Sequence, residues 1–335
     1  MKKTLRKIFA KTFVFILITL MTLMLFGGCG KKPAEKMEVR VGGLKGPTSM
    51  GLLFLREMNK SGNAEENYEF TMVTAADELL TMMVKGELDI ALLPANMASV
   101  LYNKTEGGIS VININTLGVL YMVSGDESIQ VPADLKGRTV YLTGKGTTPD
   151  YVLHYIMQGN GLTDTDITLE YKSEATEVAA VLAENPDAVG LLPQPFVTAA
   201  CAQNEALGVV MDMNEQWAAL QGENGSSMVT GVTVVRNAFL EENEEAVKTF
   251  LQEHKESTEA INADTVKGSV LAVEAGIIAK ETIAAKAIPE CNITYIDGDE
   301  MKHALSGYLT VLFEQDPKSV GSALPADGFY YVDQE

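Results

Sequence analysis

Two copies of one supersecondary pattern lie in tandem in this sequence, and this duplication limits the possible folds more than any other feature. In each copy a β-rich run leads into a Lys-Gly-x-Thr segment, at residues 45–48 and again at residues 145–148. The tripeptide Leu-Leu-Pro ends at Pro94 in the first copy and at Pro193 in the second. Because both matches recur in the same order at an offset of about 100 residues, we predict two similar units.

Within each copy, short apolar runs alternate with amphipathic stretches. Residues 90–93 (Ile-Ala-Leu-Leu) and 189–192 (Val-Gly-Leu-Leu) carry no polar side chain, which is typical of parallel strands covered on both faces. Residues 50–58 and 151–157 place apolar side chains at helical spacing. The alternation predicts an α/β fold with two similar lobes, each a right-handed layer of strands and helices.

Two extended segments are predicted to join the lobes. Residues 109–123 form a long β-rich stretch, and residues 228–235 form a second one that has no counterpart to open a third unit. We therefore expect the second run to return to the first sheet, which makes a two-strand hinge. The predicted boundaries are residues 37–127 plus 228–335 for lobe 1 and 128–227 for lobe 2, with helices at 242–262, 266–278, 281–287 and 301–313 packed mainly on lobe 1.

The N-terminus has the order of a secretion signal. Residues 1–11 are basic, residues 12–26 are apolar without a charge, and Gly27-Gly28-Cys29 follows. The apolar run is shorter than the roughly 20 residues that a membrane span needs.

The Gly-Gly-Cys ending resembles the bacterial lipobox, in which cleavage precedes the cysteine and a diacylglyceryl thioether anchors the protein. The resemblance implies a signal peptide and lipobox at residues 1–29, lipid on Cys29, and a polar tether at residues 30–36. The protein would then be anchored to the cell membrane on its extracytoplasmic side. An uncleaved anchor, or ordinary secretion with a coincidental cysteine, stays open as an alternative.

Composition excludes several classes of partner. The chain has 26 Lys and Arg against 45 Asp and Glu, a net charge of −19, so it lacks the basic face that nucleic acid requires. The same acidity argues against adhesion of the folded surface to anionic lipid. With three cysteines the chain is not a disulfide scaffold, and Cys201 and Cys291 either pair or remain free thiols.

The sequence carries no motif that indicates an enzyme. His154, His254 and His303 lie on three separate helical stretches without a nearby cysteine pattern, so we expect no metal site. A Gly-x-Ser-x-Gly elbow and a phosphate-binding P-loop are both absent from the sequence. We therefore predict no catalytic residues and no cofactor.

Ligands of open α/β sheets bind beyond the carboxyl ends of the strands. Helices that begin near Pro47 and Pro149 would present free N–H groups and hydroxyls there, which suit an anion. Alternatively, the hydroxyls are ordinary helix caps, the lysines are solvated, and the tyrosine is part of the core. The predicted ligand-binding residues are Lys45, Gly46, Thr48, Ser49, Asn96, Tyr121, Gly146, Thr147, Thr148, Gln194 and Thr230.

Three stretches carry a family resemblance: residues 39–48, 86–94 and 134–140. With Cys29, they resemble solute-binding lipoproteins of ABC importers of the nitrate/taurine/alkanesulfonate type, a group that includes receptors for thiamine-pyrimidine precursors. The resemblance covers essentially everything after residue 37. It implies the type II periplasmic-binding-protein fold, a small solute held between the lobes, an ABC permease as partner, and a monomer.

The solute and the role are less constrained than the fold. Two helix starts with hydroxyls favour a sulfonate, a carboxylate or a similar anion. Neither half places an arginine at the predicted site, which keeps a neutral or zwitterionic heterocycle open. The alternative roles are an enzyme on the same fold, of the menaquinone-pathway or pyrimidine-synthase kind, and a sensory receptor. The lipobox favours transport, because those enzymes act in the cytosol.

Overall fold

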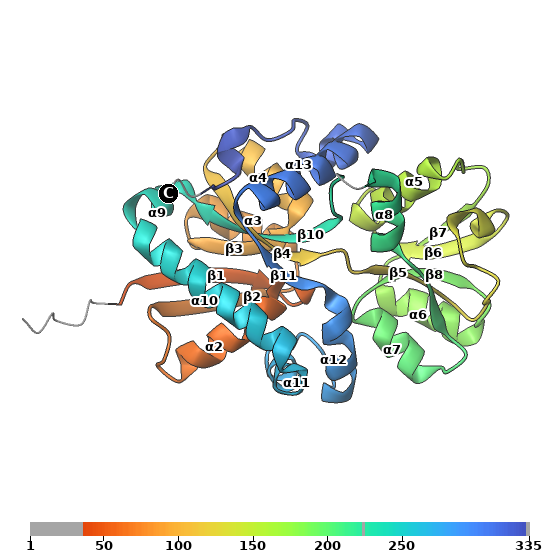
Figure 1. Ribbon diagram of the computed structural model, residues 1–335, viewed down its shortest axis with the longest axis horizontal. Coiled ribbons are helices and arrows are strands. Elements are labelled where there is room, and N and C mark those ends of the chain that lie inside the picture. The colour runs from red at the N-terminus through yellow and green to blue at the C-terminus, as the bar shows by residue number, and fades with distance from the viewer. Residues whose placement is uncertain (1–35, 223–224, 333–335) are drawn as a thin grey trace, which may run out of the picture. The chain divides into compact units, whose positions relative to one another are not determined.

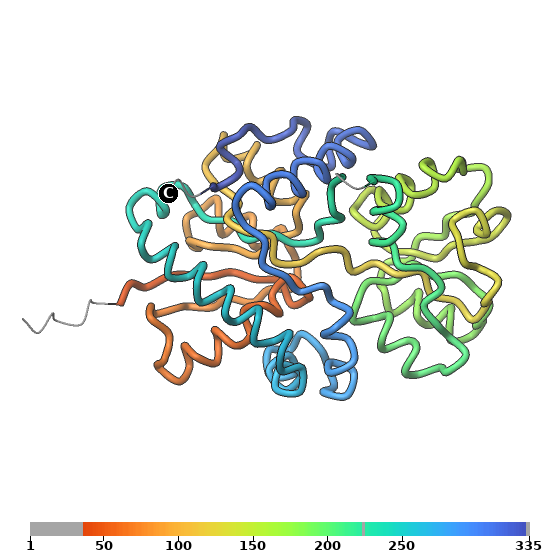
Figure 2. Tube along the Cα trace, viewed as in Figure 1, coloured from red at the N-terminus to blue at the C-terminus, as the bar shows by residue number. Residues whose placement is uncertain are grey.

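The computed structural model describes residues 36–222 and 225–332 (Figures 1 and 2). Met37–Glu335 forms one compact unit. The predicted signal peptide, Cys29 and the tether before Lys36 lie outside the described residues. In the part of the chain that is described, no helix is both long and apolar enough to cross a membrane.

The first sheet is built from segments that are far apart in the sequence. Its strands are β1 (Glu38–Leu44), β2 (Asn67–Val73), β3 (Ile90–Pro94), β4 (Ile109–Leu117), β10 (Val229–Arg236) and β11 (Ile293–Ile296). They lie in the order β11-β4-β10-β3-β1-β2. β1 pairs in parallel with β2 and β3, and β10 lies antiparallel between β3 and β4. The prediction that the second extended run returns to the first sheet is confirmed.

The second sheet repeats this arrangement. Its strands are β5 (Leu120–Ser124), β6 (Thr139–Thr143), β7 (Thr168–Lys172), β8 (Val189–Pro193) and β9 (Gly208–Asp212), in the order β7-β6-β8-β5-β9. This order matches β2-β1-β3-β10-β4 strand for strand, with the antiparallel strand in the same place. The predicted α/β fold with two similar lobes is confirmed, and β11 is an additional edge strand that the sequence did not indicate.

Helices cover both faces of each sheet (Figure 1). They are α2 (Leu53–Lys60), α3 (Ala76–Lys85), α4 (Ala95–Lys104), α5 (Thr148–Gly159), α6 (Ala175–Glu184), α7 (Phe196–Gln203), α8 (Met213–Gln221), α9 (Asn237–Glu242), α10 (Glu244–Ala263), α11 (Thr265–Glu274), α12 (Glu281–Ala287) and α13 (Gly298–Gln315). Short 3-10 turns are η1 (Pro47–Leu52), η2 (Pro132–Leu135), η3 (Ile288–Cys291), η4 (Pro317–Val320) and η5 (Asp327–Phe329).

β3 shows why its sequence is entirely apolar. Successive side chains of a strand point to opposite faces of the sheet. Ala91 and Leu93 join a core formed with α3, α4 and α13, whereas Ile90 and Leu92 join a core formed with α2 and α10. Both faces of the strand are therefore buried, as the apolar run predicts.

The chain crosses between the sheets earlier than the sequence suggested. β5 pairs with β8 and β9, so the stretch that was assigned to lobe 1 as far as residue 127 changes sheet at Gly118 and Val119. The Gly118 carbonyl accepts hydrogen bonds from the side-chain amides of Asn214 at 2.8 Å and Asn292 at 2.6 Å. A side chain at Gly118 would clash with Asn214 and Met228, so the crossing is tightly enclosed.

Two C-terminal helices reach both lobes. α12 packs against α7 and α13 packs against α5, although we expected these helices to pack mainly on lobe 1. At the end of α13, Asp316 accepts a hydrogen bond from the hydroxyl of Tyr151 at 3.2 Å, and the side-chain amide of Gln315 donates to that of Gln158 at 3.0 Å. Cys201 on α7 and Cys291 in η3 are free thiols.

A buried carboxylate holds the first sheet together at the end opposite the carboxyl termini of its parallel strands β1 and β3. Asp89, directly before β3, accepts from Arg40 Nη2 at 2.6 Å and from Arg236 Nη2 at 2.8 Å. Burial raises the pKa of Asp89, but hydrogen bonds from both arginines outweigh that effect and hold the pKa below its usual range. One carboxylate thus links β1, β3 and β10.

Replacing Asp89 with Asn is expected to lower the free energy of unfolding by about 3 kcal/mol, the low end for a broken buried pair, because both arginines keep contact with water.

Since the pKa of Asp89 is lower in the folded state, its stabilisation is complete above about pH 4 and disappears as the pH falls through the folded pKa. Urea unfolding at several pH values measures both effects. Asp126→Asn, which removes a partly exposed carboxylate from Arg138, is the control; an equal loss there would contradict the assignment.

Candidate functional site

The carboxyl ends of β3 in lobe 1 and of β8 in lobe 2 both lie close to the crossing, the segment at Gly118 and Val119 where the chain passes from one sheet to the other. Pro94, the last residue of β3, pairs with Gly231 of β10, and Gly231 pairs in turn with Thr116 before the crossing. In lobe 2, Pro193 at the end of β8 pairs with Leu120 directly after the crossing. Both strand ends therefore lie at the junction of the lobes, which is where open α/β sheets bind ligands.

The segment after β1 buries two hydroxyls. Thr48 and Ser49 are 6% and 0% exposed, and neither side-chain oxygen has a hydrogen-bond partner among the described residues. Ser49 Oγ occupies the space beside Gly43 of β1, whereas Thr48 lies against Gly231 of β10. A buried hydroxyl without a partner costs free energy, so the hydroxyl of Thr48 is the strongest candidate for contact with a ligand.

The other predicted groups of this segment are engaged or solvated. The helix expected to begin at Pro47 is the 3-10 turn η1, and the α-helix starts at Leu53. The backbone N–H of Lys45 donates to the Val73 carbonyl at 2.9 Å, and its side chain is exposed. The Gly46 N–H donates to the Leu44 carbonyl at 2.9 Å. The backbone N–H groups of these two residues therefore support the loop.

A β-bulge lies at Thr230, directly before Gly231. The pairing of β10 with β4 shifts register between Val229 and Gly231, so Thr230 stands outside the ladder, and bulges of this kind redirect a side chain. A Cβ atom at Gly231 would come within 2.5 Å of Thr48 Cγ2 and of Asn115 Oδ1. The structure thus brings Thr48 and Asn115 together at Gly231, next to Thr230.

In lobe 2 the helix start already holds a carboxylate of the chain itself. α5 begins at Thr148, and Asp150, its third residue, accepts the Gly146 N–H at 2.7 Å. The hydroxyl of the exposed Thr147 donates to the Gly144 carbonyl at 2.6 Å. The expected open anion site at this helix start is therefore corrected: the nearest negative group, Asp150, occupies it.

Asp150 belongs to a charged cluster. It accepts from Tyr171 Oη at 2.6 Å and lies 3.0 Å from His154 Nδ1. Burial raises the pKa of Asp150, but hydrogen bonds from His154, Tyr171 and Gly146 hold it below its usual range. The hydrogen bond to Asp150 raises the pKa of His154 to about 9. At neutral pH the start of α5 thus carries a paired carboxylate and imidazolium, with Lys145 Nζ 5.2 Å above the Tyr171 ring.

Three further predicted residues bond to the chain itself. The Asn96 side chain donates to a backbone carbonyl of η4 at 3.2 Å, and the Tyr121 hydroxyl donates to a backbone carbonyl of η3 at 2.9 Å. Gln194 Oε1 accepts from the backbone N–H of Thr198 at 3.3 Å and from its hydroxyl at 2.9 Å. These contacts give all three side chains structural roles at the junction of the lobes.

Tyr308 of α13 is a candidate that the sequence did not indicate. It is fully buried, and its hydroxyl lacks a hydrogen-bond partner among the described residues, although Thr148 at the start of α5 approaches it. Its ring lies 5.4 Å from that of Trp217 on α8. Tyr308 therefore brings a further unpartnered hydroxyl, from α13, against elements of lobe 2.

A cavity of about 280 Å³ lies beside the crossing. Its walls come from the end of β4, from α8, from the segment that leads into β10, and from Asn292. Within the described residues, no group of three His, Cys, Asp or Glu side chains is placed to hold a metal ion. His254 is buried away from water, and burial lowers its pKa to about 3.

Comparison with known proteins gives a family match over part of the chain. A family model described as NMT1/THI5 like matches residues 108–266. No curated protein sequence matches the chain.

Several solved structures share the fold. An ABC transporter protein from Parabacteroides distasonis is 25% identical with a TM-score of 0.74, and the match covers 88% of this chain and 99% of that one. The periplasmic aliphatic sulphonate binding protein SsuA from Escherichia coli is 16% identical with a TM-score of 0.70, covering 89% and 93%. A Candida albicans protein described as having the generic periplasmic binding protein fold is 11% identical with a TM-score of 0.55, covering 87% and 92%.

The pairing of His154 with Asp150 predicts a pH dependence. An NMR titration should show the His154 imidazole losing its proton near pH 9, and Asp150→Asn should bring the midpoint back toward about 6.5. Because the pKa is raised by folding, the stabilisation from this pair is complete below about pH 6.5 and is lost as the pH rises through about 9. His254, neutral throughout, is the internal control. An unchanged midpoint in the variant would contradict the pairing.

Proposed function

We propose that this chain, an NMT1/THI5-like protein with the type II periplasmic-binding-protein fold, is the extracytoplasmic solute-binding component of an ABC importer. It holds a small solute between its lobes and delivers it to a permease in the membrane. The observation that carries this proposal is the meeting of both sheets at the crossing, with the unpartnered hydroxyl of Thr48 beside it. A ligand that contacts both lobes favours the closed arrangement.

The role is binding and not catalysis. The solved protein from Parabacteroides distasonis is an ABC transporter protein, and SsuA from Escherichia coli binds aliphatic sulphonates. Those properties fit a chain that places hydroxyls and backbone at the junction of its lobes. They support transport over an enzyme on the same fold.

Charges at the site favour a solute with a single negative group. The buried hydroxyl of Thr48 offers a hydrogen bond in lobe 1, but the start of α5 in lobe 2 is occupied by Asp150. Asp150 is already paired with the His154 imidazolium, so the start of α5 adds no free charge of either sign. One negative group, alone or balanced by a cationic group within the solute, therefore suits this site better than two. The arginines of the described chain all lie elsewhere: Arg40 and Arg236 on Asp89, Arg138 on Asp126, and Arg56 beside Phe70. A zwitterionic or singly anionic sulfonate or carboxylate is therefore the proposed solute class.

A thermal-shift screen tests the function. The full chain, purified in mild detergent, is screened against sulfonates, zwitterionic sulfonates, nitrate, amino acids and pyrimidines. A hit should also change the emission of Trp217, the single tryptophan, because its ring contacts Tyr308 of α13. Thr48→Ala should weaken a hit about tenfold, which is the effect of one hydrogen bond to a charged group.

Thr147→Ala is the matched control for Thr48→Ala. Its exposed hydroxyl donates to the Gly144 carbonyl, so affinity should change less than about twofold. If the affinity for the hit is unchanged in Thr48→Ala, the placement of the solute against η1 is wrong. If no solute of these classes stabilises the chain, the proposed function itself is contradicted.

Lipid anchoring belongs to the same proposal. Cys29→Ser should abolish incorporation of a fatty-acid label and move the protein from the membrane fraction to the soluble fraction. Cys201→Ser, which removes a cysteine on α7, should leave both unchanged. Label that persists in Cys29→Ser would exclude Cys29 as the lipidated residue.

A further inference from the structure

A second cavity lies in lobe 1, away from the crossing. It has a volume of about 430 Å³ and lies between α2, the edge strand β2 and α11. All of its lining residues belong to lobe 1, so its shape does not depend on contact with lobe 2. Its volume is within the range of small-molecule sites.

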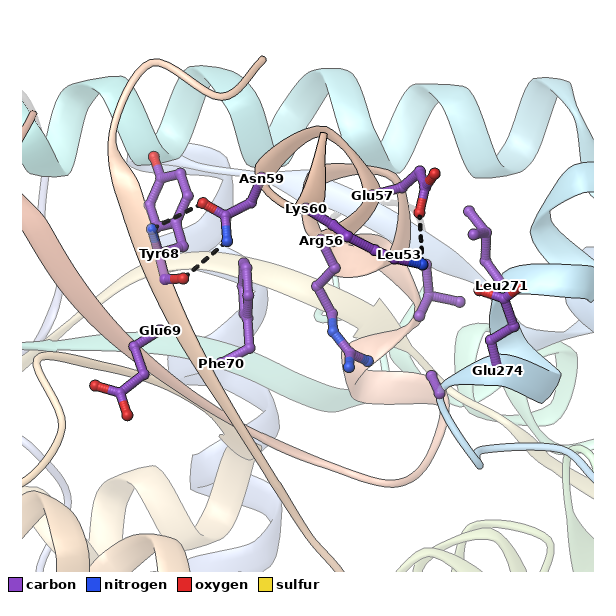
Figure 3. A pocket seen from close by; sticks show the side chains of 11 residues that line it. Leu53, Arg56, Glu57, Asn59, Lys60, Tyr68, Glu69, Phe70, Leu271 and Glu274 are labelled. Atoms are coloured by element: carbon purple, nitrogen blue, oxygen red, sulfur yellow. Dashed lines mark hydrogen bonds and ion pairs between the residues drawn. The ribbon is translucent and has the colours of Figure 1, made fainter. Parts of the chain in front are cut away.

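The feature that distinguishes this cavity is an arginine without an anion. Arg56 of α2 lines it, and Figure 3 shows the guanidinium directed into the space beside Phe70. Nη1 of Arg56 is enclosed and has no hydrogen-bond partner among the described residues. The guanidinium of Arg56 lies over the Phe70 ring, with the guanidinium carbon 5.9 Å from the ring centroid. Burial lowers the pKa of Arg56, as expected of a charge taken from water without compensation.

Such a cation is exceptional in this chain. Arg40, Arg138 and Arg236 each bond to a carboxylate at 2.6 to 2.8 Å. Arg56 is half-buried, and its enclosed Nη1 loses contact with water without gaining a hydrogen bond, which costs free energy. The chain, with a net charge of −19, has an excess of carboxylates. The free fork of Arg56 is suited to a carboxylate that arrives with a ligand.

The rest of the cavity restricts that ligand. Leu53, Phe70 and Leu271 supply apolar wall around Arg56, which suits an aliphatic group. Glu274 lines the opposite side from Phe70 in Figure 3 and has no ion-pair partner in the described chain. A plain anion would be repelled by Glu274, whereas a ligand that also carries an ammonium group would be attracted to it.

We infer that this cavity is a second binding site, for an α-amino acid with an apolar side chain. The carboxylate pairs with Arg56, the ammonium group faces Glu274, and the side chain lies among Leu53, Phe70 and Leu271. The site is independent of the solute that the lobes enclose, because none of its residues lies at the crossing.

Calorimetric titration of the full chain with three matched probes tests this site. L-Leucine carries both charged groups, 4-methylpentanoate lacks the ammonium group, and 3-methylbutylamine lacks the carboxylate. L-Leucine should bind at least about tenfold more tightly than either of the other two. Glu274→Gln should reduce the preference for L-leucine over 4-methylpentanoate.

Arg56→Met should weaken L-leucine binding at least about tenfold while leaving the melting temperature without ligand unchanged or higher, because it removes an uncompensated charge. Lys60→Met is the matched control: Lys60 lines the same cavity, but its ammonium group lies 3.9 Å from Glu57. It should change L-leucine affinity less than about twofold.

Three outcomes overturn the second site. One is the absence of L-leucine binding at about 10 mM. Another is equal affinity in Arg56→Met and the unchanged chain. The third is binding that Thr48→Ala abolishes and Arg56→Met does not, which would place L-leucine between the lobes. That last result would leave the proposed transport function standing, just as failure of the solute screen would leave this site untouched.

Discussion

The arrangement of both lobes depends on the backbone at Gly118, where the chain leaves one sheet and enters the other. Its carbonyl accepts two side-chain amides, one from Asn214 in lobe 2 and one from Asn292 near β11. On either side of it, Leu117 N–H donates to the Asn292 carbonyl and Gln194 N–H donates to the Val119 carbonyl. These bonds hold the ends of β3 and β8 close to the crossing, so a few residues of extended chain join the two sheets. Glycine is required there because any side chain would displace Asn214 or Met228.

Much of the fold could be predicted because the duplicated pattern shows which strands are buried on both faces of a sheet. Ile90–Leu93 is apolar on both faces, and only a covered parallel strand needs that composition. The change of sheet at Gly118 was missed because the β-rich run continues through it, and a single glycine does not show in which sheet the next strand pairs. β11 has four residues, too few for a periodicity to be read. The contacts of α12 and α13 with lobe 2 depend on tertiary packing, which no local pattern encodes.

The site was predicted less well, for the same physical reason. Thr48 was predicted from its place after a strand, since the carboxyl ends of parallel strands converge, and its hydroxyl is buried without a partner. The capture of the α5 start by Asp150 was open to prediction, because an acidic residue three positions into a helix commonly bonds back to the preceding loop. Tyr308 had no signal at all: its place against Thr148 arises only after α13 has packed across the lobes. The partners of Asn96 and Tyr121 lie in η4 and η3, which are distant in sequence, so no local pattern could indicate them. Gln194 instead bonds to Thr198, four residues further along the chain.

The discontinuity of lobe 1 has a consequence for biogenesis. Every strand of the second sheet lies between Leu120 and Asp212, an uninterrupted stretch, so that half of the molecule has all its pairing partners once this stretch has left the ribosome or the translocation channel. The first sheet must wait for β10 and β11, and until they arrive β3 and β4 expose unpaired edges. The second sheet can therefore fold first as the chain emerges. The two ends of the chain then complete the first sheet beside a lobe 2 that has already folded.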